Sequence, residues 1–159
     1  MGNKEDKTNV MRILDQKRIP YKSFAFECSG AMPGVEVAQL LGLDPAKVFK
    51  TLVTVGKSGE HYVFVIPVAA ELNLKLAAAA VSEKNIEMIR SKDLLPLTGY
   101  IHGGCSPIGM KKFFTTTFDA SVLQCDTVTF SGGRIGRQVQ LSPEELKKAI
   151  RYQTARLCD

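Results

Sequence analysis

Two adjacent apolar segments joined by a short turn constrain the fold of this chain more than any other feature. Residues 49–55 and 61–68 are rich in valine and aromatic residues, which favour strands. Gly56 and Gly59 lie between the two segments, and glycines in so short a connection favour a tight hairpin turn. The sequence therefore predicts two antiparallel strands near the middle of the chain.

Helix signals lie on both sides of this hairpin. A first helix is expected to begin near Thr8 or Asn9 and to end at Pro20, and a capping box at residues 142–145 is expected to begin a last helix that reaches about Leu157. Further helical segments are expected at residues 35–41 before Gly42, at a short turn from Asp44-Pro45, at the alanine-rich residues 72–80, and in part at 86–95.

Further strands mix with these helices in an irregular order. They are expected at residues 21–26, 113–118, 128–130 and 138–141, and Tyr100 is expected to begin another. This order favours an α+β fold over a strictly alternating βαβ fold, and no dinucleotide-binding glycine pattern follows the first strand. We therefore expect one compact domain over residues 1–159, with a mixed, partly barrel-like sheet surrounded by helices.

The charge of the chain bears on its partners and its compartment. Lysine and arginine number 21 and aspartate and glutamate 16, which gives a net charge of +5. A basic chain suits a polyanionic partner such as nucleic acid, although a solvated basic surface is the simpler interpretation. No apolar run is long enough to span a membrane, and the charged start MGNKEDKTNV lacks the apolar region of a secretory signal. We therefore expect a cytoplasmic protein without a membrane partner.

The cysteines form neither a metal-binding nor a disulfide pattern. No C-x-x-C pair occurs among the four cysteines, which are Cys28, Cys105, Cys125 and Cys158. The two histidines lie far apart in the sequence. This spacing argues against a zinc site, and no metal or other cofactor is expected. Free thiols also fit a reducing compartment.

Lys50 lies among the apolar residues of the first hairpin strand. Strand alternation places it on one face with Leu52, while Phe49 and Thr51 share the other face. A lysine in this position either reaches solvent from a strand end or is held in a pocket, where its ammonium meets a phosphate or a polarised carbonyl.

Two glycine-rich stretches are candidate binding loops, GYIHGGCSPIG from Gly99 to Gly109 and SGGRIG from Ser131 to Gly136. Glycine pairs free backbone amides from side-chain cover, as in phosphate nests and oxyanion holes. The alternative is a tight structural turn between two strands. Together with Lys50, the two loops favour a single binding cleft.

Cys105 and Ser106 raise the question of a protein nucleophile. A catalytic cysteine needs an activating base or a helix N-terminus, and the sequence does not fix the geometry of the nearby His102. The alternative for Cys105 is a small residue in a tight loop. Ser106 lies in no nucleophile-elbow or triad motif, so it is a better candidate for hydrogen bonding than for attack.

Four motifs in this order resemble the YbaK/EbsC family of aminoacyl-tRNA deacylases. They are KVFKTLV, PVAAELNLKLAAAA, TGYIHGGCSPIGMKK and SGGRIGRQVQL, and the resemblance covers nearly the whole chain. Its most specific part is the Gly-Gly-x-Ser-Pro-x-Gly loop followed by basic residues. The family is similar to the editing domain of bacterial prolyl-tRNA synthetases, and this chain looks like the freestanding Cys-tRNA(Pro) deacylase branch.

The resemblance implies a substrate, a mechanism and a partner. The substrate is tRNA mischarged with cysteine, mainly Cys-tRNA(Pro), with Cys-tRNA(Cys) as a second one. The substrate's own thiol attacks its ester carbonyl and expels the tRNA as a cyclic thiolactone forms, without a metal. The protein then contributes position and electrostatics, and we expect prolyl-tRNA synthetase to supply the choice of tRNA.

Carried over by position, the resemblance makes Lys50 the catalytic strand lysine, which holds the ester carbonyl or the phosphate end of the terminal adenosine. The substrate-binding residues are then expected to be Phe26, Gly103, Gly104, Cys105, Ser106, Pro107, Ser131, Gly132, Gly133 and Gln138. Phosphate contacts to tRNA are expected from Lys111, Lys112 and Arg134, with a solvated dibasic turn as the alternative for the two lysines.

Two positions depart from the family's familiar member, which has tyrosine where this chain has Phe26 and aspartate where it has Gln138. The departures keep alternatives open. One is a deacylase for another small amino acid such as alanine. Another is a catalytically weak module that binds tRNA or a synthetase, and a third is a binder of an aminoacyl-adenylate or a nucleotide.

Overall fold

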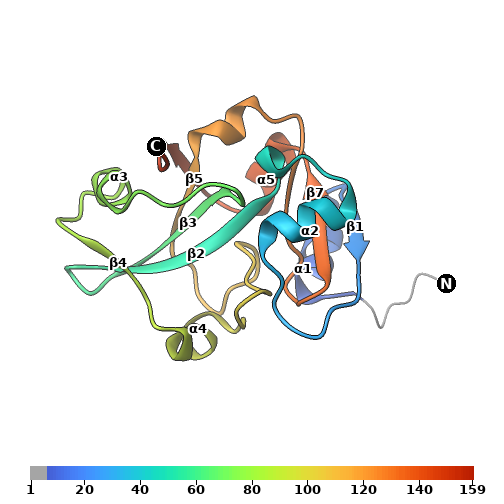
Figure 1. Cartoon of the computed structure of the whole chain (residues 1–159), viewed down its shortest axis with the longest axis horizontal. Coiled ribbons are helices and arrows are strands. Elements are labelled where there is room, and N and C mark those ends of the chain that lie inside the picture. The colour runs from blue at the N-terminus through green and yellow to red at the C-terminus, as the bar shows by residue number, and fades with distance from the viewer. Residues whose placement is uncertain (1–6) are drawn as a thin grey trace.

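The predicted hairpin forms the centre of the structure, a computed structural model that describes residues 7–159. Its strands β2 (Phe49–Gly56) and β3 (His61–Pro67) are antiparallel, with Val53 opposite Val63 (Figure 1). Residues 1–6, on which the expectation about a secretory signal partly depends, lie outside the described residues.

The strands form two sheets. The five-stranded sheet has the order β4-β2-β3-β5-β8; β2 pairs antiparallel with β3 and β4 (Ile86–Met88), and β3 pairs parallel with β5 (Thr115–Asp119). The antiparallel three-stranded sheet has the order β1-β7-β6 and consists of β1 (Lys22–Ala25), β7 (Arg137–Leu141) and β6 (Val128–Ser131).

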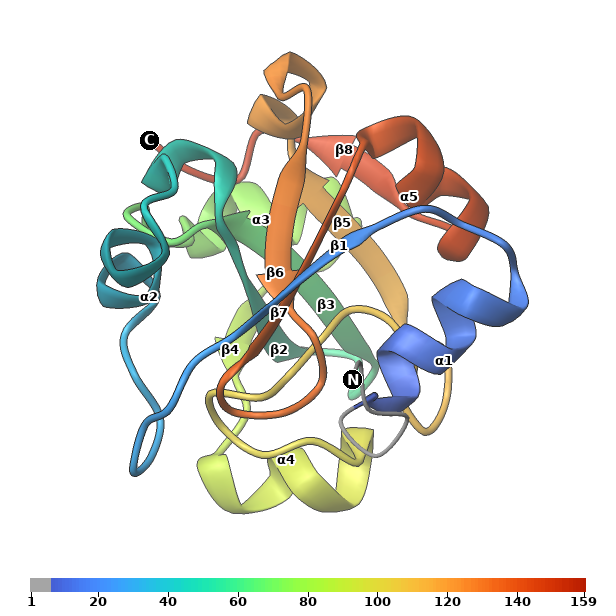
Figure 2. The same ribbon diagram turned by 90° about the vertical axis from the view of Figure 1, so that its right-hand side faces the viewer.

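The three-stranded sheet lies across the five-stranded sheet, as Figure 2 shows. A parallel bridge between Val48 and Thr129 joins the start of β2 to β6. The predicted α+β fold with a mixed, partly barrel-like strand arrangement is therefore confirmed, although the strands split into two sheets and do not close into a barrel.

Helices surround the two sheets, and local signals define their ends. Helix α1 (Asn9–Gln16) begins where the Thr8 hydroxyl oxygen accepts a hydrogen bond from the N–H of Met11, and α2 (Gly34–Leu41) ends at Gly42. The other helical segments of the described chain are η2 (Pro45–Lys47), α3 (Leu74–Ala80), α4 (Ser91–Thr98), η3 (Ala120–Gln124) and α5 (Pro143–Ala149). None of the helices in the described residues is long and apolar enough to cross a membrane.

Most of the apolar core lies between the two sheets. Strand β3 contributes apolar side chains to both faces of the five-stranded sheet. Val65 packs in the core between the sheets, and Phe64 packs on the opposite face with residues of α3. The fully buried Phe118 of β5 links the sheets, since its ring centroid lies 6.1 Å from that of Phe49 and 6.4 Å from that of Phe130.

Three expectations about element bounds are wrong. The first helix ends at Gln16, because Arg18 adopts a left-handed φ of +57° before Pro20 is reached. Tyr100 begins no strand; it belongs to a loop in which its hydroxyl donates to the carbonyl oxygen of Ile108. The last helix ends at Ala149, and β8 (Gln153–Ala155) then pairs in parallel with β5, which satisfies backbone groups at that sheet edge.

Candidate active site

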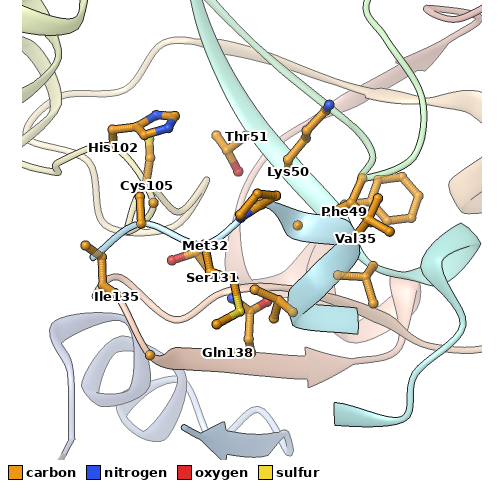
Figure 3. Close-up of a pocket in the computed structure, with 18 of the residues that line it drawn as sticks. Met32, Val35, Phe49, Lys50, Thr51, His102, Cys105, Ser131, Ile135 and Gln138 are labelled. Carbon is orange, nitrogen blue, oxygen red and sulfur yellow. The ribbon is translucent and has the colours of Figure 1, made fainter. Parts of the chain in front are cut away.

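A cavity of about 470 Å³ lies where the two sheets diverge. Val48 and Thr129 form a bridge between the two sheets, whereas further along the same strands Lys50, Thr51 and Ser131 border the cavity. Figure 3 shows side chains from the loop before α2, from the loop around His102 and from β7 completing the walls. The volume is in the range of small-molecule pockets, roughly 300–1,000 Å³.

The cavity brings together part of the predicted site. The predicted residues on its walls are Phe26, Lys50, Gly103, Cys105, Ser131 and Gln138. The predicted residues that lie within two positions of these in the chain without bordering the cavity are Gly104, Ser106, Pro107, Gly132 and Gly133. The predicted tRNA contacts Lys111, Lys112 and Arg134 also lie outside its walls, and all three are exposed.

Lys50 lies at the boundary of the cavity. It is half-buried, and Figure 3 shows its side chain leaving β2 on the opposite side from Thr51 and pointing away from Ser131 and Gln138. Burial raises the pKa of the Cys158 thiol to about 11, and the charge of Lys50 opposes this rise. The Lys50 side chain is therefore directed to the edge of the cavity rather than into its interior.

Neither Cys105 nor Ser106 is an activated nucleophile. Cys105 is 9 % exposed, and burial raises the pKa of its thiol to about 12, so the thiol is protonated at neutral pH. Ser106 is fully buried, and its hydroxyl oxygen accepts a hydrogen bond from the N–H of Ile108 at 3.2 Å. The structure thus favours the interpretation of both as small loop residues.

Three of the glycine amides in the two candidate loops donate hydrogen bonds within the protein. The N–H of Gly104 donates to the carbonyl oxygen of Ile101 at 2.9 Å. The N–H of Gly133 donates to the hydroxyl oxygen of Ser131 at 3.1 Å, and that of Gly132 to the Arg137 carbonyl oxygen at 2.8 Å. These three amides are therefore not available to a ligand.

The glycines instead allow the loops to approach one another closely. A Cβ added to Gly104 would lie 3.2 Å from the Cα of Arg134, in the second glycine loop. One added to Gly103 would lie 2.8 Å from the Cβ of Ala31, and Gly103 also has a φ of +89°. The bare backbone of the first loop is thus required for the packing that closes one side of the cavity.

Some wall residues were missed by the sequence reasoning. The apolar side chains of Met32, Val35 and Ile135 border the cavity, and no local pattern marks them. Thr51 was recognised only as a residue on the strand face of Phe49, yet its hydroxyl oxygen is buried and has no hydrogen-bond partner. The strand alternation that singled out Lys50 could have indicated Thr51 as well.

The walls carry little charge. Among the described residues no aspartate or glutamate borders the cavity. Within the same part of the chain, no group of three or more histidine, cysteine, aspartate or glutamate side chains is placed to hold a metal ion. The site can therefore bind a small, largely apolar group and present the Lys50 ammonium to a negative charge beside it.

Comparisons with known proteins agree on the family. The aminoacyl-tRNA editing domain family matches residues 30–149. The Enterococcus faecalis protein EbsC, named as a Cys-tRNA(Pro)/Cys-tRNA(Cys) deacylase, is 43% identical over 154 residues, which cover 96% of this chain and 94% of EbsC.

Two solved structures share the fold at 24% identity. The hypothetical protein APE2540 has a TM-score of 0.85, with 96% of this chain and 100% of that one covered. A protein described as a trans-editing enzyme for prolyl-tRNA synthetase has a TM-score of 0.82, with 96% and 98% covered. Since the family match spans most of the sequence and agrees with the motifs, this chain belongs to the aminoacyl-tRNA editing domain family.

Proposed function

We propose that this chain is a trans-editing deacylase that removes cysteine from mischarged Cys-tRNA(Pro), with Cys-tRNA(Cys) as a second substrate. The family supports the reaction type, which is cleavage of the aminoacyl ester, and the relative EbsC supports the substrate. A cavity of about 470 Å³ with mainly apolar walls has room for a small aminoacyl group.

The observation that carries the proposed reaction is that no aspartate or glutamate among the described residues borders the cavity to complete a catalytic triad. The Cys105 thiol is protonated because burial raises its pKa to about 12. The Ser131 hydroxyl is engaged by Gly133, and no carboxylate is present on the walls to complete a triad. This favours a nucleophile that comes from the substrate, and cysteine carries one.

In the proposed step the thiol sulfur of the bound cysteine attacks its own ester carbonyl carbon. A carbon–sulfur bond forms, the bond from that carbon to the terminal ribose oxygen of the tRNA breaks, and the thiol proton ends on this oxygen. The products are a cysteine thiolactone and free tRNA. The protein accelerates this step by holding the thiol and the carbonyl close together.

Lys50 is the proposed catalytic residue. Its side chain leaves β2 at the boundary of the cavity, and we expect the ester and the terminal adenosine of a bound substrate to lie beside it. There it stabilises the negative charge that develops on the carbonyl oxygen or holds the adjacent phosphate.

The test is the loss of ester from Cys-tRNA(Pro) and Ala-tRNA(Pro), measured with wild type and Lys50→Ala. We expect rapid loss of cysteine alone and a decrease of about 100-fold in Lys50→Ala, the usual effect of removing one group that stabilises developing charge. Lys57→Ala is the matched control, since Lys57 is exposed in the hairpin turn, away from the cavity. Cleavage of the alanyl ester alone would show that the substrate is Ala-tRNA(Pro). Cleavage of neither ester would refute the proposal that this chain is a deacylase.

We also propose that prolyl-tRNA synthetase supplies the choice of tRNA. The exposed Lys111 and Lys112 already have partners in the fold, because Lys111 Nζ lies 3.3 Å from the Pro96 carbonyl oxygen and Lys112 Nζ lies 5.8 Å from the Phe114 ring centroid. Contacts from such side chains to phosphates depend on salt and carry little sequence information. Cys-tRNA(Pro) and Cys-tRNA(Cys) should therefore react at similar rates with this protein alone and diverge when the synthetase is added. Strong discrimination by the protein alone would contradict this.

A further inference from the structure

The hydroxyl of Thr51 is buried and lacks a partner. Among the described residues, only Thr51 and Ser121 bury a side-chain oxygen or nitrogen in this way, and of the two only Thr51 borders the cavity. A buried hydroxyl without a hydrogen bond is unfavourable, and native structures retain one where a ligand or a water completes it.

The position of Thr51 on β2 directs its hydroxyl away from Lys50. Phe49 and Val53, two residues before and after it, are both buried in the inter-sheet core. In Figure 3 the oxygen of Thr51 points into the side of the cavity where Met32 and Ser131 lie. A polar group therefore interrupts an otherwise apolar row at the residue where that row borders the cavity.

The surroundings restrict what can complete this hydroxyl. A cationic group such as a substrate ammonium is disfavoured, because no aspartate or glutamate of the described chain borders the cavity. An anion would be drawn to Lys50, which leaves the strand on the other face. The partner of the hydroxyl that these surroundings favour is a small, uncharged group that forms weak hydrogen bonds and is attached to an apolar side chain. A thiol is such a group.

We propose that Thr51 recognises the thiol of the bound cysteine and sets the preference of the site for cysteine over alanine. This proposal rests on the proposed function and extends it to the residue that reads the side chain. The hydroxyl donates a hydrogen bond to the sulfur, and an alanyl group would leave the hydroxyl without a partner. A site built around a hydrogen bond rejects a ligand that lacks the matching group.

The experiment measures binding separately from cleavage. Cysteine and alanine are each joined through an amide to 3′-amino-3′-deoxyadenosine, which gives two ligands that the protein cannot deacylate. Their dissociation constants are compared for wild type, Thr51→Val, Thr51→Ser and Thr54→Val. Thr54 is the matched control, because it lies on the same strand, donates to the Tyr62 carbonyl oxygen and does not border the cavity.

We expect Thr51→Val to reduce the preference for the cysteinyl ligand by about tenfold, the effect of one hydrogen bond. Thr51→Ser keeps the hydroxyl and should retain most of the preference, and Thr54→Val should leave the preference unchanged. Valine has the shape of threonine, so Thr51→Val should also melt no lower than wild type in the absence of ligand.

Two results would overturn the proposal. One is an equal change of both dissociation constants in Thr51→Val, as expected if the hydroxyl only binds water. The other is a clearly lower melting temperature of Thr51→Val without ligand, because the hydroxyl would then have a partner inside the protein. If wild type cleaves no cysteinyl ester, the proposed function fails, whereas the ratio of the two dissociation constants still tests Thr51.

Discussion

The replacement of Gly103 by alanine tests the loop packing that closes the cavity. Gly103 has a φ of +89°, and an added Cβ would lie 2.8 Å from the Cβ of Ala31. An L-residue in a left-handed conformation costs about 1–2 kcal/mol, and overpacking adds about 1–3 kcal/mol. We therefore expect Gly103→Ala to lower the free energy of unfolding by about 2–5 kcal/mol.

Urea unfolding followed by far-ultraviolet circular dichroism measures this change, with Gly30→Ala as the matched control. Gly30 lies in the same loop as Ala31, and a Cβ added there would meet nothing within 4 Å. Because alanine restricts the unfolded chain, Gly30→Ala should leave stability unchanged or raise it by up to about 1 kcal/mol.

A second substitution separates the contact from the backbone strain. Ala31→Gly removes the Cβ that the new side chain would meet, so it should restore part of the stability of Gly103→Ala. The two substitutions should therefore couple by about 1 kcal/mol, within the range for residues in contact. Equal urea midpoints for Gly103→Ala and wild type, or an additive double variant, would refute the close approach of these loops.

Three further predictions concern a thiol, a carboxylate and the core. Cys105→Ala should deacylate within about threefold of wild type, because a thiol with a pKa of about 12 is no nucleophile, and a far larger loss would contradict this. Hydrogen bonds from Ser58 and Tyr62 lower the pKa of Glu83, so its contribution to stability is present above its ordinary pKa and is lost as pH falls through the lowered one. The urea midpoint of Glu83→Gln should thus lie below that of wild type at pH 7 and converge with it in acid; a pH-independent gap would argue against this. Phe118→Ala should lower the free energy of unfolding by about 3–5 kcal/mol, measured with urea, and a change below about 1 kcal/mol would be inconsistent with its burial.

The elements that sequence reasoning predicted well are those defined by a few neighbouring residues. Thr8 caps α1, Gly42 ends α2 in a left-handed conformation, and Ser142 caps α5, as their residue types indicate. The central hairpin belongs to the same class, because its turn and its two strands are adjacent in the chain.

The elements that were missed depend on partners far away in the sequence. Strand β8 has only three residues, and its pairing with β5 joins Gln153 to Thr117. The local pattern at 150–157 does not distinguish a continued helix from such a short strand. Tyr100 is of a residue type that favours strands, but it lies in a loop. There its hydroxyl donates a hydrogen bond to the Ile108 carbonyl oxygen, and this contact exists only once the loop has folded.

The candidate site divides in the same way. The motifs selected loops that the fold does bring together with Lys50, but they did not show which loop residues face the cavity. Gly103 and Gly104 are adjacent and identical in type, yet only Gly103 borders it. A Cβ added to Gly104 would instead meet the backbone around Arg134, and no local signal records this proximity.

The proposed reaction indicates how a site that relies on the substrate's nucleophile can still select an amino acid. Binding alone separates cysteine from alanine weakly, because one small group in a pocket changes affinity by only about 10- to 200-fold. In the proposed reaction alanine is rejected a second time, since it carries no thiol to attack its ester. Loss of the Thr51 hydroxyl should therefore weaken the preference in binding while the preference in cleavage remains. If Thr51→Val instead released alanine from Ala-tRNA(Pro), water would have to act as the nucleophile, and the selection by the substrate's own chemistry would be wrong.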